Sequence, residues 1–166
     1  MRKSERKKYA IGYMKAKTSK GGDGYEKYEE YDNEFCEWCF DEWIKEQQRF
    51  TGTLYRGQRI GEEWFKNLDY NIGKVITPSD IYNHSYPSFT ESEMRAVLYI
   101  NDYDVFDDKP ISILYNVECN GKYAVNIKEH SYYPEENEHL FVKESNFEIT
   151  DIKYLGSYVR VYMKEI

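Results

Sequence analysis

The spacing of apolar residues changes along this chain, and that change constrains its fold more than any other feature. Residues 33–49 place apolar side chains three to four positions apart, as an amphipathic helix does. Residues 138–143, 147–154 and 157–163 instead alternate apolar with polar side chains, as half-buried strands do. Helices early in the chain and an antiparallel meander late in it predict an α+β domain.

Shorter segments complete this prediction. We expect further strands at 51–59, 74–77, 111–118 and 122–127, and further helices at 61–68 and 91–100. Asn120-Gly121, between the last two of these strands, is a strong short signal for a β-hairpin turn. Asp32 or Asn33 can cap the first helix, because a short polar side chain accepts hydrogen bonds from its free backbone amides.

Basic residues gather at the N-terminus of an otherwise acidic chain. The 166 residues hold 23 Lys and Arg against 30 Asp and Glu, a net charge of −7, yet residues 1–20 hold eight basic residues and one acidic residue. We interpret residues 1–30 as a basic, partly flexible arm that could contact RNA, and residues 31–166 as a single domain. The acidic remainder argues against a dedicated nucleic-acid-binding surface, which needs positive charge.

Several protein classes are excluded by composition. No apolar run approaches the roughly 18 residues of a membrane-spanning helix, so we expect no membrane partner. The basic N-terminus is followed only by the short apolar stretch 9–14, so we expect no signal peptide. Three cysteines are too few for a disulfide framework, which favours a reducing, cytoplasmic location.

The residues that most often bind metals do not form a recognisable site. Cys36 and Cys39 have no second pair to complete a zinc site, and we interpret them as core packing. His84, His130 and His139 are scattered, and we interpret them as surface or loop residues. We therefore expect no metal.

Leu54-Tyr55-Arg56-Gly57 lies in an expected strand and is the first candidate for a functional site. A guanidinium can bind a phosphate through two parallel hydrogen bonds, and a neighbouring glycine lets a ligand approach the backbone. Taken alone, an arginine at such a place is more often a surface charge.

Pro87-Ser88-Phe89-Thr90 is the second candidate, because its hydroxyls can orient another side chain. The alternative is structural. Thr90 would be the N-cap of the helix over 91–100, and Glu93 would complete a capping box. Both interpretations hold if Ser88 and Thr90 divide the two roles.

Glu136 and Glu138 are the third candidate. They lie two positions apart where a strand is expected to begin, so their side chains face the same side of the sheet. Two carboxylates so close repel each other and raise one pKa where the site is partly dry. Such a pair can stabilise a cationic transition state and orient a nucleophile. The alternative is a solvated, acidic strand end.

Together and in this order, Arg56, Ser88-Phe89-Thr90 and Glu136-Asn137-Glu138 resemble the Arg–Ser–Glu class of mono-ADP-ribosyltransferases, which includes bacterial arginine-modifying toxins and bacteriophage enzymes. The resemblance covers roughly residues 51–155. It implies N-terminal helices packed on a mainly antiparallel split β-sandwich, with the catalytic domain over 31–166. It also implies NAD as co-substrate, no metal, and transfer of ADP-ribose to an arginine of a target protein with release of nicotinamide.

The resemblance implies roles for individual residues. Glu138 would stabilise the positive charge that develops on the ribose as nicotinamide leaves, and Ser88 would hydrogen-bond to it. Arg56 would bind the phosphate and ribose region of NAD, and Gly57 would offer its backbone to the nicotinamide carboxamide. The family motif is usually Ser-Thr-Ser, so whether Ser88 or Thr90 corresponds to the family serine, and is the functional hydroxyl, stays open.

Further roles concern the acceptor and the nicotinamide. Glu136, with Tyr132 and Tyr133, would recognise the acceptor, because a carboxylate pairs with a guanidinium. Tyr103 or Phe106 would stack on the nicotinamide ring. Two other functions stay open: an NAD glycohydrolase, in which water is the acceptor, and a non-catalytic β-rich interaction module. A small intracellular effector, a phage-encoded host modifier or the toxin of a toxin–antitoxin pair fits such a chain.

Overall fold

The computed structural model describes residues 1–19, 24–82, 86–101 and 110–166, and over these ranges it shows one sheet with helices around it. The strands are β1 (Thr51–Gly61), β2 (Val75–Ile76), β3 (Ser88–Thr90), β4 (Pro110–Asn120), β5 (Ala124–Asn126), β6 (Glu138–Phe141), β7 (Phe147–Tyr154) and β8 (Val159–Glu165). The α-helices are α1 (Lys3–Ser19), α2 (Glu34–Lys45), α3 (Glu62–Leu68) and α4 (Glu93–Asn101). The 3₁₀ helices are η1 (Tyr25–Lys27), η2 (Glu29–Tyr31), η3 (Pro78–Asp80) and η4 (Pro134–Glu136). The predicted α+β class is confirmed.

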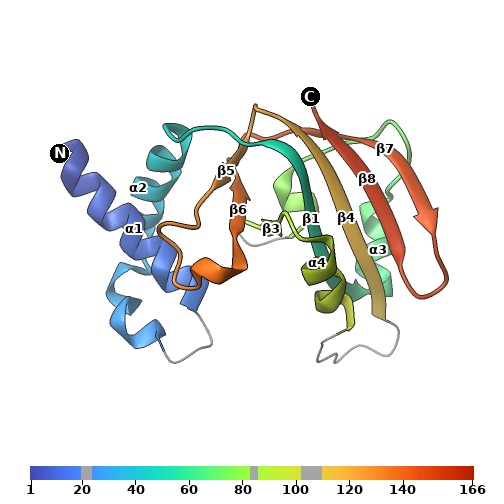
Figure 1. Cartoon of the computed structure of the whole chain (residues 1–166), viewed down its shortest axis with the longest axis horizontal. Helices are drawn as coiled ribbons and strands as arrows, with labels where there is room; N and C mark the ends of the chain where they lie inside the picture. The colour runs from blue at the N-terminus through green and yellow to red at the C-terminus, as the bar shows by residue number, and fades with distance from the viewer. Residues whose placement is uncertain (20–23, 83–85, 102–109) are drawn as a thin grey trace.

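The strands lie in the order β2-β7-β8-β4-β1-β3-β6-β5, and the sheet is curled (Figure 1). β4 and β8 run parallel, and the other neighbouring strands run antiparallel. Among the described residues, β1 and β3 are joined by a single pair, Tyr55 opposite Thr90. This narrow junction divides the sheet into a large half, β2-β7-β8-β4-β1, and a small half, β3-β6-β5.

The hairpin predicted around Asn120-Gly121 is wrong. β4 pairs with β1 and β8, whereas β5 pairs with β6, so the turn links the two halves of the sheet. Gly121 does reverse the chain, with a φ of 88°. The carboxylate of Glu165, buried at the end of β8, accepts hydrogen bonds from the backbone amides of Asn120, Lys122 and Tyr123. A distant side chain therefore holds the turn, and the predicted meander is interrupted.

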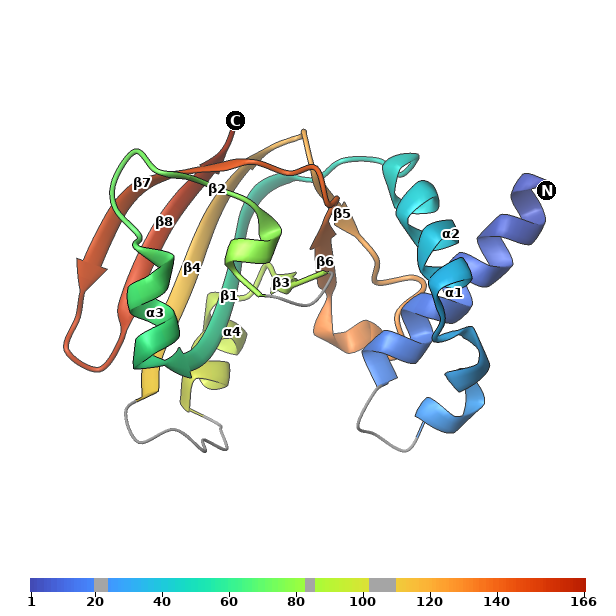
Figure 2. The ribbon, with the colours of Figure 1, turned by 180° about the vertical axis from the view of Figure 1, so that it is seen from behind.

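α3 and α4 cover opposite faces of the large half, as Figures 1 and 2 show from the two sides. Trp64 and Leu68 of α3 pack on the apolar core of that half. α1 and α2 pack on each other and on the small half, where a second apolar cluster joins Met14, Phe40 and Leu140. Helices packed on a mainly antiparallel sheet are the arrangement expected from the sequence.

α2 confirms the first predicted helix, although it ends earlier, at Lys45. Asn33 is its N-cap and accepts a hydrogen bond from the backbone amide of Cys36 at 2.9 Å. Beyond the helix, Arg49 donates to the carbonyl oxygens of Ile44 and Lys45, both at 2.9 Å. The arginine side chain therefore satisfies carbonyl groups that the end of any helix leaves free.

The basic N-terminal segment, which we predicted to be a partly flexible arm, is largely helical. Lys3–Ser19 is helical and buries Ala10, Tyr13 and Met14. These residues follow helical spacing, but the many lysines around them hide the pattern in the sequence. No helix in the described parts of the chain is long and apolar enough to cross a membrane.

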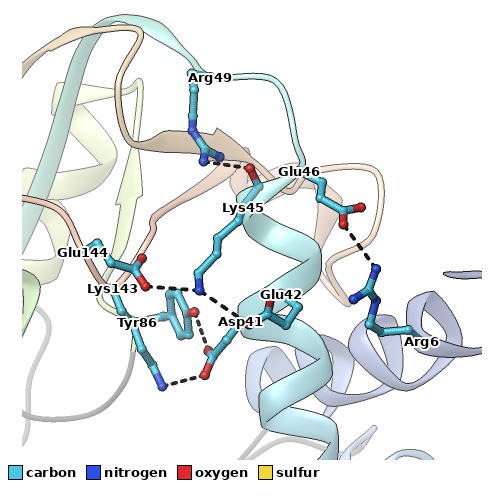
Figure 3. A network of polar contacts seen from close by, with 9 residues as sticks. All are labelled: Arg6, Asp41, Glu42, Lys45, Glu46, Arg49, Tyr86, Lys143 and Glu144. Carbon is cyan, nitrogen blue, oxygen red and sulfur yellow. Dashed lines mark hydrogen bonds and ion pairs between the residues drawn. The ribbon is translucent and has the colours of Figure 1, made fainter. Parts of the chain in front are cut away.

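A network of polar contacts ties α2 to the segment before β3 and to the segment after β6 (Figure 3). Asp41 accepts hydrogen bonds from the hydroxyl of Tyr86 and from the ammonium of Lys143, the latter at 2.9 Å. Lys45 pairs with Glu144 at 3.3 Å. Tyr86 precedes β3 by two residues and Lys143 follows β6 by two, so the network anchors these two of the three strands of the small half to α2.

Candidate active site

Three neighbouring strands bring together the three sequence motifs. Arg56 lies on β1, Ser88 begins β3 and Glu138 begins β6, and these strands are adjacent in the sheet. Arg56 Nη1 donates to the carbonyl oxygen of Ser88 at 3.0 Å. The hydroxyl of Ser88 hydrogen-bonds to Glu138, and the charge of Arg56 acts on the same carboxylate. The sheet order therefore makes one site of residues far apart in sequence.

Arg56 is held on three sides. Its Nε donates to Gln58 Oε1 at 2.8 Å, its Nη1 donates to Ser88, and its guanidinium carbon lies 5.0 Å from the centre of the Tyr82 ring. Burial lowers the pKa of Arg56, while Tyr115, Tyr82 and Glu138 raise it. An arginine stays charged in proteins nonetheless. Its Nη2 forms no hydrogen bond with any residue that the structure describes, so this group is available to an anion.

Glu138 has a perturbed acidity. Burial raises the pKa of its carboxyl from 4.5 to about 7, and the charge of Glu136 adds to that rise. The hydrogen bond from Ser88 and the charge of Arg56 lower the pKa and partly offset the burial. A carboxylate with such a pKa, beside a cation and a hydroxyl donor, is typical of a catalytic centre.

The two hydroxyls of the serine motif have different partners. Ser88 hydrogen-bonds to Glu138, whereas Thr90 Oγ1 accepts a hydrogen bond from the backbone amide of Ser92 at 3.1 Å. Ser92 immediately precedes α4, and its Oγ accepts a hydrogen bond at 3.1 Å from the backbone amide of Arg95 in the first turn of that helix. The predicted cap at Thr90 is wrong, because the helix begins two residues later than that prediction requires and Ser92 caps it.

Glu136 reaches the site through an unusual turn. It ends η4, and Asn137 then adopts a left-handed conformation with a φ of 48° before β6 begins. Asn137 Nδ2 donates to Glu91 Oε2 at 2.7 Å, which ties the turn to the start of α4. Burial raises the pKa of Tyr99, a residue of α4 that sequence reasoning missed, and the charges of Glu136 and Glu138 both raise it further. The two glutamates therefore share one electrostatic environment.

The structure describes two of the four aromatic residues that we predicted to contact the acceptor or the nicotinamide. The ring of Tyr132 packs on Gly24, where any side-chain carbon would clash with it, and against Tyr28. Tyr132 is thus engaged with the N-terminal region, and Tyr133 packs edge-on against its ring. Tyr103 and Phe106 lie outside the described residues.

Gly57 has a packing role that sequence reasoning missed. A Cβ atom at this position would collide with the backbone carbonyl oxygen of Ala96 in α4. The absence of a side chain therefore lets α4 lie close to β1, beside Arg56. Sequence reasoning also missed the contact of Gln58 with Arg56. It could have been expected, because residues two apart in a strand face the same side of the sheet.

The residue types that bind metals are dispersed in the described parts of the chain. Within these parts, no group of three or more His, Cys, Asp or Glu is placed to hold a metal ion. Cys36 and Cys39 are buried and free, in agreement with core packing. The interpretation of His139 as a surface or loop residue is wrong, because this residue lies in β6 and is fully buried. His84 lies outside the described residues.

Comparison with known proteins gives a result at the level of the fold. No protein-family model matches the sequence, and no curated protein matches it. Solved structures do match. The Vis toxin, an ADP-ribosyltransferase from Vibrio splendidus, superposes with a TM-score of 0.66 at 16% identity, over 98% of this chain and 73% of that one. Vis is also solved in complex with agmatine.

Two further ADP-ribosyltransferases match similarly. Plx2a, an ADP-ribosyltransferase toxin from Paenibacillus larvae, has a TM-score of 0.61 at 15% identity, over 98% of this chain and 86% of that one. An ADP-ribosyltransferase from Clostridium botulinum has a TM-score of 0.61 at 13% identity, over 96% of this chain and 85% of that one. The chain therefore has the ADP-ribosyltransferase fold.

Proposed function

We propose that this protein is an NAD-dependent mono-ADP-ribosyltransferase, which moves ADP-ribose from NAD to an arginine of a target protein and releases nicotinamide. One observation carries the proposal: Arg56 and Ser88 both act on Glu138, a carboxyl whose burial raises its pKa to about 7. The likeness of the fold to ADP-ribosyltransferases supports it. We further propose that residues 31–166 form the catalytic domain.

The chemistry suits a buried carboxylate. When the bond between nicotinamide and ribose breaks, nicotinamide leaves with the bonding electrons and positive charge develops on the ribose. A fixed negative charge in a site that excludes water stabilises that charge more than water does. We assign this role to Glu138, and the hydrogen bond from Ser88 keeps part of the carboxyl population ionised near neutral pH.

NAD fits the donor groups of the site as a co-substrate. Its pyrophosphate is a dianion, and Arg56 offers an Nη2 group that no described residue occupies. A planar guanidinium binds phosphate oxygens through parallel hydrogen bonds, which a lysine cannot do. We assign phosphate binding to Arg56 and orientation of the catalytic carboxylate to Ser88, and we assign no ligand contact to Thr90, whose hydroxyl serves Ser92.

The acceptor is proposed to carry a guanidinium group. Glu136 is half-buried and close enough to Glu138 to change its pKa, so it can pair with a cation held beside the ribose. Vis binds agmatine, which carries a guanidinium group. Tyr133 is the aromatic residue we assign to acceptor contact, because Tyr132 is engaged with Gly24 and Tyr28.

A protein acceptor is favoured over RNA. Arg2 pairs with Glu5, and Lys3 and Arg6 both pair with Glu46, so part of the basic charge of α1 is already neutralised. We propose a cytoplasmic site of action, in the producing or the target cell, because the three cysteines are free thiols.

The test uses labelled NAD with agmatine, and in parallel with a cell lysate. Wild type should release nicotinamide and label both, and Glu138→Gln should do neither. Glu136→Gln should still release nicotinamide but lose the labelling. Glu135→Gln is the matched control, since Glu135 is an exposed carboxylate in the same turn. Nicotinamide release without labelling in wild type would identify a glycohydrolase, and neither activity from folded protein would favour an interaction module.

A further inference from the structure

Polar side chains continue behind Arg56 into the core of the large half. Gln58 is nearly buried and Tyr115 is fully buried, and both lie on the central strands β1 and β4. Gln58 Oε1 accepts the hydrogen bond from Arg56 Nε at 2.8 Å. Gln58 Nε2 donates to the carbonyl oxygen of Ile81 at 2.8 Å and to the hydroxyl of Tyr115 at 3.2 Å. Every polar atom of this amide is thus engaged.

The contacts leave the amide of Gln58 one orientation. The carbonyl oxygen of Ile81 can only accept, so the amino group of the amide must face it. The amide oxygen then faces Arg56 Nε, which can only donate. A flipped amide would set two donors against each other at Arg56 and two acceptors at Ile81. A backbone carbonyl therefore determines which atom Gln58 presents to the arginine.

The hydroxyls beyond Gln58 complete a directed chain of hydrogen bonds. Tyr70 donates its single hydroxyl proton to the carbonyl oxygen of Asp80 at 2.6 Å. Tyr115, 2.9 Å from the Tyr70 oxygen, must therefore be the donor in that pair. Burial raises the pKa of both tyrosines, so both hydroxyls stay protonated at neutral pH. The chain ends on backbone, which cannot rotate away.

We propose that Gln58 is a positioning residue that holds the guanidinium of Arg56 in the orientation that binds NAD, with Tyr115 and Tyr70 as its support. The inference rests on the proposed function. Gln58 holds the Nε edge and the Ser88 carbonyl holds Nη1, so the guanidinium plane cannot turn and Nη2 stays directed away from both. A preoriented donor loses less entropy when it binds a phosphate than a free one does.

The kinetic test compares Gln58→Met with Gln47→Met. Methionine is close to glutamine in length but offers no comparable acceptor, and Gln47 is a half-buried glutamine that bonds to Trp43 in α2, away from the site. For Gln58→Met we expect the KM for NAD to rise about tenfold, the size expected from losing one hydrogen bond to a charged group. The kcat should stay within about twofold of wild type, since Glu138 is untouched. Gln47→Met should change neither constant.

A second readout needs no activity. The Nε–H of Arg56 gives an NMR signal, which can be assigned by its absence in Arg56→Lys. A hydrogen bond to a buried acceptor protects this proton from exchange with water. We expect exchange to be at least about tenfold faster in Gln58→Met than in wild type. In Tyr115→Phe, which removes one support of Gln58 and leaves its contact with Arg56, the increase should be smaller.

The outcomes separate this inference from the proposed function. Unchanged exchange and an unchanged KM in Gln58→Met would overturn the inference. A fall in kcat with a lower melting temperature, at constant KM and constant exchange, would also overturn it and leave Gln58 a packing residue. If wild type neither binds nor cleaves NAD, the proposed function fails and the NAD part of the inference with it, while the exchange rates still decide whether Gln58 holds Arg56.

Discussion

The hydroxyl of Ser88 hydrogen-bonds to the carboxyl of Glu138 along a diagonal, because the strand register sets Thr90, and not Ser88, directly opposite Glu138. Diagonal neighbours on adjacent strands lie within reach of a longer side chain such as glutamate. Thr90, although opposite, uses its hydroxyl to accept from the backbone amide of Ser92. The two hydroxyls of one short motif therefore serve the Glu138 carboxyl and the start of α4 separately.

Replacing the two hydroxyls should have different effects on the pH dependence of NAD cleavage. In wild type, activity should rise with pH around 7, as Glu138 ionises. Ser88→Ala removes a hydrogen bond that lowers the pKa of Glu138, so the rise should move to higher pH. Thr90→Ala should leave the pH of this rise unchanged. It should lower the free energy of unfolding by about 1 kcal/mol, because it removes a cap-like hydrogen bond. Nicotinamide release measured from pH 5 to 9 checks both, and an identical profile for Ser88→Ala would contradict the assignment.

Glu138→Gln should stabilise the protein, and more so at higher pH. The pKa of Glu138 is raised from 4.5 to about 7 on folding, so between these values the folded protein holds more protons than the unfolded chain. The contribution of this group to stability therefore falls as pH rises from 4.5 through 7. Glutamine resembles the neutral acid and escapes that loss. Melting temperatures of the variant and wild type should nearly coincide at pH 4 and differ most at pH 8, with Glu135→Gln as the control. A difference that is independent of pH would show that Glu138 is not the group responsible.

Gly57→Ala should lower both stability and activity. Its methyl group would meet the carbonyl oxygen of Ala96, so α4 must move away from β1. We expect a loss of about 2 kcal/mol, as for an overpacked core, and a higher KM for NAD, because Arg56 is the preceding residue. Gly156→Ala is the comparison. The φ of 79° at Gly156 disfavours a side chain, but a Cβ atom there would have no other atom within 4 Å. Urea unfolding and NAD kinetics check the prediction, and equal NAD constants in the two variants would refute it.

Glu165→Gln should destabilise the protein without touching the site. The carboxylate accepts from three backbone amides around Gly121, and both of its oxygens take part. A glutamine has one acceptor oxygen, so its amino group would face at least one amide proton. We expect a loss of about 2 kcal/mol in the free energy of unfolding, measured in urea, since buried donors would lose a charged partner. Glu148→Gln, on the neighbouring strand β7, should have little effect, and a loss as large as that of Glu165→Gln would argue against the amide contacts as the cause.

Local patterns in the sequence predicted the elements with a clear periodicity. The cap at Asn33 and the alternation over 147–154 correspond to α2 and β7 as observed. The three motifs around Arg56, Ser88 and Glu138 were also found in the sequence, because strands and loops of known chemistry have short signatures. Local backbone preference and side-chain alternation act over a few residues, so they can be recognised without knowing the fold.

The sequence could not predict which strands become neighbours. Asn120-Gly121 indicated a hairpin, but the strands on either side pair with β1, β8 and β6, which lie far away in the sequence. The same limit applies to His139, whose burial depends on contacts such as the ring of Phe50 from a distant segment.

The sequence by itself determined the residue types of the site and the class of the fold. Only the tertiary structure decided that Ser88 serves Glu138, that Gly57 admits α4, and that Gln58 accepts a hydrogen bond from Arg56. Each of these contacts joins residues whose meeting depends on sheet order, register or helix packing. Those features arise from burial summed over the whole chain, and so no short segment encodes them.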